Sequence, residues 1–129
     1  MALTLLLLSI LLGFVHIFAA IGAETKERGA DWNAGPRDGD APDLPPVVGR
    51  LKRAQANYME TWPFFAALML AVMIRGSGGA LATSGGLLYL LTRAAYLPLY
   101  ARGVPKIRSY AYLVSLIGIA LVALAALLS

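Results

Sequence analysis

The chain has 129 residues, of which 59% are hydrophobic and 14% are charged, with a net charge of +4 and a mean hydropathy of +0.70. This composition lies outside the range of soluble globular domains and predicts a protein whose solvent is lipid, so a soluble nucleic-acid-binding protein is a poor interpretation of the positive charge. The chain contains no cysteine, which excludes a disulfide, a protein thiolate nucleophile and a cysteine-ligated metal.

The first predicted element is the segment 1–23, which carries no Lys, Arg, Asp or Glu. About 20 apolar residues of helix cross a bilayer core, so this segment is long enough to span it. A cleaved signal peptide would begin with basic residues and have a shorter apolar core, so we expect a retained helix. His16 has no second ligand-type residue nearby, which favours a helix-to-helix hydrogen bond over a metal ligand or proton relay, and no metal site is predicted.

The segment 24–46 differs in composition from everything around it. It holds six acids, four prolines and three glycines, and the stretches 33–36 and 38–40 are typical of turns. We expect an irregular cytoplasmic loop. Two interpretations stay open: a solvated linker, or a loop that folds over a site at the helix ends with Trp32 at the membrane interface.

Three further helices are predicted, over residues 47–75, 79–101 and 107–128. The apolar stretch 61–74 is too short to span a bilayer, but it continues backwards through 47–60 without a proline and so becomes a full span. Glycines and alanines in the spans allow close helix packing. The sequence therefore predicts an all-α integral membrane protein, with residues 1–129 as a single four-transmembrane-helix bundle.

The basic residues predict the orientation of this bundle. Arg75 alone marks the connection between the second and third spans. The other ten of the eleven Lys and Arg lie between the first and second spans or at and near the connection between the third and fourth: Lys26, Arg28, Arg37, Arg50, Lys52, Arg53, Arg93, Arg102, Lys106 and Arg108. Because Lys and Arg in short loops stay cytoplasmic, both basic connections are expected inside and both termini outside the cytoplasm.

Four polar residues fall on one face of the second predicted helix. Steps of three and four residues bring Arg50, Arg53, Asn57 and Glu60 into one stripe. An ionised carboxylate that faces lipid is costly, so we expect Glu60 to turn inward towards a cation. The stripe is consistent with interfacial anchors and an interhelical salt bridge, or with a binding site.

A second stripe follows on the third predicted helix, where Arg93, Tyr96 and Tyr100 stand at i, i+3 and i+7. Arg108 and Ser109 begin the fourth helix near the same membrane face. The tyrosines form either an aromatic belt or, with the first stripe, the wall of a basic recess between helices. Such a recess would suit an anionic ligand, because arginine binds carboxylates through two parallel hydrogen bonds and clustered cations favour a thiolate over a thiol.

These residues resemble the pattern of the MAPEG family, the membrane-associated proteins in eicosanoid and glutathione metabolism. The segment Arg53–Phe64 contains the Arg, the Asn four residues later, the Glu three further on, and then Pro and an aromatic residue. The similarity continues in Arg93, Tyr96, Tyr100 and the segment 107–109. The segment 33–38 is similar to that of small bacterial members.

The resemblance implies a homotrimer of four-helix protomers in a bacterial inner membrane, with glutathione bound between neighbouring subunits near the cytoplasmic face. Arg108 is implied as the catalytic residue that stabilises the glutathione thiolate. The residues implied to bind glutathione are Arg53, Asn57, Glu60, Arg93, Tyr96, Tyr100 and Ser109.

The predicted function is that of a glutathione-binding membrane enzyme of transferase or peroxidase type. Its second substrate is expected to be a lipophilic electrophile or hydroperoxide that arrives through the bilayer. The alternative is a non-enzymatic protein of the same fold, whose polar stripes serve trimer assembly. A small four-span drug exporter is disfavoured because the first helix lacks a carboxylate within the membrane.

Overall fold

The computed structural model describes residues 1–128, and its regular elements are all helices. They are α1 (Ala2–Arg28), α2 (Ala30–Ala34), α3 (Pro46–Arg75), α4 (Ala80–Ala101) and α5 (Ile107–Leu127). The predicted all-helical class is confirmed, with a short fifth helix in addition to the four long ones in this part of the chain. Ser129, the last residue of the predicted domain, lies outside the described residues.

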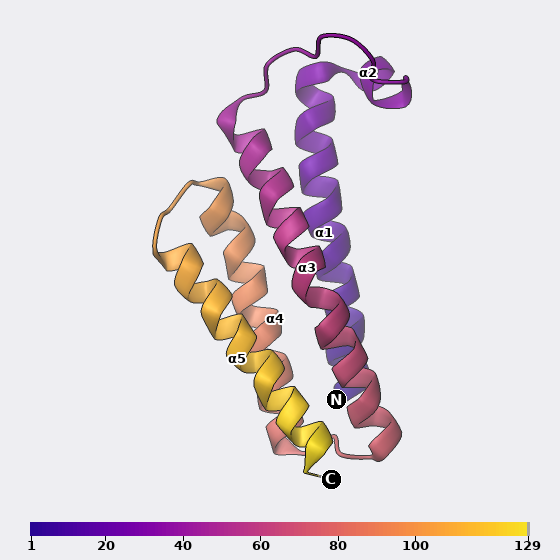
Figure 1. Cartoon of the computed structure of the whole chain (residues 1–129), viewed down its shortest axis with the longest axis vertical. Helices are drawn as coiled ribbons and strands as arrows, with labels where there is room; N and C mark the ends of the chain where they lie inside the picture. Colours follow the sequence, from indigo (N-terminus) through magenta and orange to yellow (C-terminus); the bar gives the residue numbers. More distant parts are fainter. Residues whose placement is uncertain (129) are drawn as a thin grey trace.

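The four long helices run alternately up and down (Figure 1). Helix α1 packs against α3 and α4 packs against α5, while contacts between α3 and α4 join the two pairs. Both termini lie at one end of the bundle, and α2 and the α4–α5 connection lie at the other (Figure 1). Both basic connections therefore share one end of the molecule.

Two of the described helices, α1 and α5, are long and apolar enough to cross a membrane by length and composition. Helices α3 and α4 have similar lengths, but polar residues interrupt their apolar sequence. Helix α3 carries five Lys, Arg or Glu side chains. Helix α4 contains glycine, serine, threonine, arginine and tyrosine residues between its leucines. The membrane crossing of these two helices therefore stays a prediction.

The segment 24–46 is more regular than the sequence predicts. Helix α1 continues through Arg28, whose Nη1 lies 2.7 Å from Glu24 Oε1 one turn earlier. Lys52 Nζ on α3 lies 3.0 Å from the other oxygen of Glu24, and this hydrogen bond lowers the pKa of the Glu24 carboxyl. The apolar pattern marks only the part of α1 that suits lipid, whereas side-chain pairs one turn apart continue the helix beyond it. The helix ends at Gly29, which has a φ of 88°.

Helix α2 folds back onto the end of α1. The Asn33 side-chain amide donates to Thr25 Oγ1, and the Arg28 guanidinium lies 5.6 Å from the centre of the Trp32 ring. These contacts hold Trp32 half-buried against α1. Within one chain, this segment is tied to α1 rather than folded over the other helix ends.

The pair α4–α5 is held at close range by glycines. A Cβ atom added at Gly118 would lie 2.7 Å from the carbonyl oxygen of Gly85, and one added at Gly85 would lie 2.7 Å from that of Gly118. Gly86 faces α1, since its added Cβ would lie 2.8 Å from Leu5 Cδ1. Small residues let the backbones approach, which is the usual basis of helix packing in membranes.

Several polar side chains inside the bundle are paired across helices. The Tyr58 hydroxyl donates to the Ser9 carbonyl oxygen at 2.6 Å, and the Trp62 indole donates to Ser9 Oγ at 3.1 Å. The predicted helix-to-helix hydrogen bond of His16 is wrong: its Nδ1 lies 2.9 Å from the Leu12 carbonyl oxygen in the same helix. The backbone acceptor one turn earlier in α1 takes the hydrogen bond of His16. His16 contacts α3 through its ring, which stacks on the Tyr58 ring with the ring centres 4.4 Å apart.

The close contact of α4 with α5 can be tested with Gly118→Ala. We expect a loss of about 1–3 kcal/mol in unfolding free energy, because the new methyl group must push the Gly85 backbone away. The measurement is unfolding in detergent followed by circular dichroism. Gly22→Ala is the matched control, since nothing lies within 4 Å of its added Cβ. Equal stability of the two variants would contradict this packing.

Candidate functional site

A polar cleft lies at the basic end of the bundle, between the start of α3 and the connection from α4 to α5. Its volume is about 250 Å³. The lining residues are Arg50 and Arg53 from α3, Tyr100 from α4, Gly103 and Pro105 from the connection, and Arg108 from α5. Two segments that are far apart in the sequence, residues 50–53 and 100–108, therefore supply one concave surface.

Tyr100 stands at the centre of this cleft. Arg53 Nε donates to the Tyr100 hydroxyl oxygen at 3.2 Å, and the Arg108 guanidinium lies 4.3 Å from the centre of the Tyr100 ring. Cation–π and charge-assisted contacts of this kind hold both arginines towards one point. The phenol therefore organises two cations that come from different helices.

The remaining wall is fixed by Arg50. Its Nε donates to the Ala101 carbonyl oxygen at 2.9 Å, at the end of α4. Gly103 adopts φ of 70° in the connection, and a Cβ there would lie 3.4 Å from Arg50 Cζ. A glycine is favoured at this position by its positive φ. The turn is thereby held close against α3.

The cleft is strongly electropositive. Three guanidinium groups line it, and no carboxylate is among the lining residues. A concave site lined by charges of one sign attracts an anion and suits binding of carboxylates through the arginine side chains.

The predicted site residues fall into three places. Arg53, Tyr100 and Arg108 line the cleft. Asn57, Arg93 and Tyr96 belong to a deeper cluster, in which Arg93 is 0% exposed. Glu60 and Ser109 are exposed and line no part of the cleft within the described residues.

The Arg93 cluster joins α3, α4 and α5. Arg93 Nη1 donates to Asn57 Oδ1 at 2.8 Å, and the guanidinium carbon lies 4.6 Å from the Tyr96 ring centre, 5.3 Å from that of Tyr58 and 5.8 Å from that of Tyr112. Within the part of the chain that the structure describes, Arg93 Nε and Nη2 have no hydrogen-bond partner. In this chain Arg93 therefore holds Asn57 and the tyrosines in place and has no open surface of its own.

The expectation that Glu60 turns inward to a cation is wrong for the single chain. Glu60 is exposed, and no ion pair joins it to a cation among residues 1–128. The inward positions of this part of α3 are taken by Tyr58, Thr61 and Phe65. The helical period therefore leaves Glu60 with Arg53 on the outer surface.

Comparison with known protein families decides which family the chain belongs to. The model of the MAPEG family matches residues 3–128. The chain belongs to the MAPEG family. The MAPEG family includes glutathione-dependent enzymes and non-enzymatic members. No curated protein matches the chain.

Membership of the MAPEG family also settles the environment of the chain. MAPEG proteins are membrane proteins in contact with lipid, and α1 and α5 have the length and apolar composition that this requires. The protein is therefore an integral membrane protein.

Three lining residues of this MAPEG chain were not predicted as site residues. Arg50 belongs to the same stripe as Arg53, and this spacing was the available signal. Gly103 and Pro105 carried no signal, because a connection lines a cleft only when it folds back against another helix. The residue pattern along one helix does not show which connection folds against it.

The contacts of Arg93 predict losses of stability of different size for two changes at Asn57. Asn57→Leu leaves Arg93 with one more unpaired donor, so we expect a loss of about 1–3 kcal/mol in unfolding free energy. Asn57→Asp places a carboxylate next to the same guanidinium, so its loss should be smaller. Unfolding in detergent measures both. An equal loss in the two variants would contradict the assigned role of the Arg93–Asn57 hydrogen bond.

Proposed function

We propose that this MAPEG protein is a glutathione-binding membrane enzyme of transferase or peroxidase type. Its second substrate is a lipophilic electrophile or hydroperoxide that reaches the site through the bilayer. The observation that carries the proposal is the cleft lined by Arg50, Arg53 and Arg108, in which Arg53 and Arg108 both contact Tyr100.

The residues of the cleft fit the acidic part of glutathione. This tripeptide carries two carboxylates, an ammonium and a thiol. The guanidinium groups of Arg50 and Arg53 suit the carboxylates, since arginine donates two parallel hydrogen bonds to a carboxylate. The ammonium needs a carboxylate, and Glu60, on the same face of α3 as Arg53, is the partner that we propose.

Arg108 is the residue proposed to favour the thiolate. Its guanidinium is half-buried and lies against the Tyr100 ring, so it is held at the inner wall of the cleft. A fixed positive charge stabilises a thiolate relative to a thiol, and the thiolate is the form that attacks an electrophile. Arg53 is exposed and better suited to binding than to activation.

The exposed charges of α3 support association with another chain, and we propose that the oligomer is a homotrimer. Arg53 and Glu60 lie on the outer surface of one chain at a level where charges facing lipid are costly. A neighbouring subunit would cover them and place Glu60 next to a second chain. The proposed arrangement has four transmembrane helices per chain, in a bacterial inner membrane, with both termini outside the cytoplasm.

Titration of the purified trimer or detergent-solubilised chain with glutathione tests the proposal. We expect calorimetric binding together with ultraviolet absorbance of a thiolate. Arg108→Ala should lower the thiolate absorbance, whereas Arg53→Ala should mainly weaken binding, about tenfold for each 1.4 kcal/mol of lost interaction. Arg102→Ala is the control, because Arg102 is exposed in the same connection and does not line the cleft. Absence of both binding and thiolate signal would reject the proposed function.

A second candidate function is favoured by the exposure of Glu60. Under this alternative the protein is non-enzymatic, and the polar stripe of α3 serves only trimer assembly. Glu60→Gln should then dissociate the oligomer in detergent without any glutathione-dependent effect, as measured by light scattering and calorimetry. Glu27→Gln is the matched control, because Glu27 is exposed on the polar end of α1. A stable oligomer that has lost affinity for glutathione would instead favour the enzyme.

A further inference from the structure

The carbonyl oxygens at the end of α4 need donors from outside the helix, because the last turn of a helix leaves its carbonyl groups without partners. The amides of residues 102–104 donate to the carbonyl oxygens of residues 98–100 at 2.9 to 3.0 Å. The next carbonyl belongs to Ala101, and its regular partner one turn later would be the amide of residue 105. That residue is Pro105, which has no N–H. The regular backbone donor for Ala101 is therefore missing.

Arg50 supplies this donor from a different helix. Its Nε donates to the Ala101 carbonyl oxygen at 2.9 Å. A positive charge at the C-terminus of α4 also complements the negative end of the helix dipole. Gly103 leaves room for the guanidinium, since a Cβ there would lie 3.4 Å from both Arg50 Cζ and Nη1. The side chain of Arg50 thus caps α4 in place of the missing amide of Pro105.

The α4–α5 connection depends on such outside contacts for its path. Gly103 has a φ of 70°, and Lys106 has a φ of 59°. A positive φ is costly for a residue with a Cβ, so Lys106 keeps this conformation only where its surroundings require it. The Ile107 amide donates to the Pro105 carbonyl oxygen at 2.6 Å, which closes a tight turn directly before α5. The contact of Arg50 with Ala101 is one of the contacts that fix this path.

Arg108 is the second residue of α5, so its position follows from the path of the connection. Its guanidinium lies 4.3 Å from the centre of the Tyr100 ring. Tyr100 and Ala101 are neighbours at the end of α4, so Arg50 holds the connection beside the ring that Arg108 contacts. A change in the path of the connection would move the Arg108 guanidinium relative to a group bound in the polar cleft.

We propose that Arg50 is a positioning residue for Arg108. By capping α4 at Ala101 it sets the α4–α5 connection, and so the place of the Arg108 guanidinium in the polar cleft. This inference rests on the proposed function, in which Arg108 stabilises the thiolate of bound glutathione. Arg50 then has two roles, because its Nε holds Ala101 while the N–H groups on its outer nitrogens remain for a carboxylate.

Two substitutions separate these roles, because the side-chain nitrogen of glutamine stands as many bonds from the backbone as Arg Nε. Arg50→Gln removes the charge and keeps a donor for Ala101, whereas Arg50→Met has a similar length and removes both. Calorimetry should show that both variants weaken glutathione binding to the same extent, within about twofold. With glutathione saturating, the thiolate absorbance of Arg50→Met alone should titrate about one pH unit higher, because Arg108 is displaced from the thiol.

Hydrogen exchange without glutathione tests the contact with Ala101 independently of the proposed function. In Arg50→Met the amides of residues 102–104 and 107 should exchange about tenfold faster than in the wild type, and in Arg50→Gln within about twofold of it. Arg102→Met is the control, because Arg102 is an exposed cation of the same connection and does not line the cleft. It should leave the exchange and the thiolate titration unchanged.

Circular dichroism and gel filtration show whether each variant folds, and Arg50→Ala replaces Arg50→Met if the latter does not. Equal exchange in the Gln and Met variants would overturn the positioning role. Equal thiolate titrations in these two variants, with glutathione bound to both, would show that the contact does not act on Arg108 and would also overturn it. A wild-type protein that binds no glutathione would reject the proposed function, and the exchange rates would then decide on Arg50 alone.

Discussion

The buried guanidinium of Arg93 holds three of the four long helices together. It donates to Asn57 on α3 at 2.8 Å and lies 4.6 Å from the ring of Tyr96 on α4 and 5.8 Å from that of Tyr112 on α5. A charge inside an apolar bundle usually has a carboxylate partner, because its desolvation is otherwise expensive. Here an amide oxygen and aromatic faces take that place, so the polar interior and the helix arrangement depend on one another.

The same cation is connected to the polar cleft through two tyrosines. Tyr96, which lies against Arg93, meets the edge of Tyr100 with ring centres 5.4 Å apart. Tyr100 in turn contacts Arg53 and Arg108. The cleft therefore has positive charge on its wall and again behind it. Both layers attract an anion, and the tyrosines keep the layers at a fixed separation.

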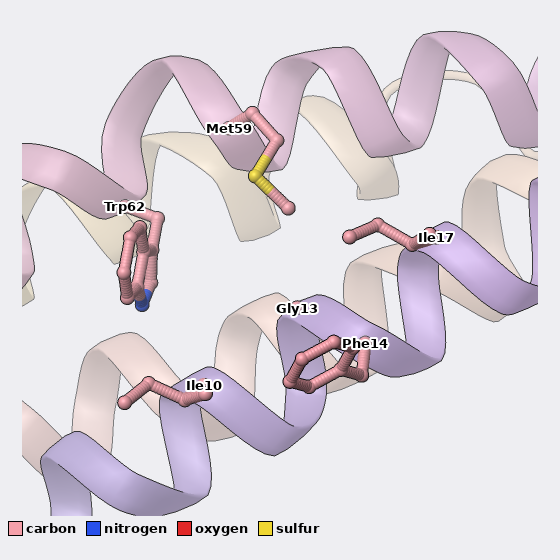
Figure 2. Close-up of a pocket in the computed structure, with 6 residues that line it drawn as sticks. All are labelled: Ile10, Gly13, Phe14, Ile17, Met59 and Trp62. Carbon is pink, nitrogen blue, oxygen red and sulfur yellow. The ribbon is translucent and has the colours of Figure 1, made fainter.

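Helix α3 has three kinds of surface, and each requires a different neighbour. Its inward side, with Phe65 stacked on Tyr89 at 4.1 Å, belongs to the packed core. Its outer stripe carries Arg53 and Glu60, which need protein or polar surroundings. Its flank beside α1, around Trp62, is apolar (Figure 2). One helix thus separates the core, the proposed subunit contact and an apolar groove against α1.

The sequence by itself determined the helical class and the bounds of α3 to α5 within one or two residues. It also placed Arg53, Tyr100 and Arg108 near one end of the bundle. Both results follow because apolar and charged residues repeat with the period of a helix. Only the tertiary structure decided that Glu60 lies outside and that Arg93 is fully buried. The reason is that periodicity assigns a residue to one face of its own helix. Which helix, lipid or cleft that face meets depends on how the glycine-lined helices pack against one another.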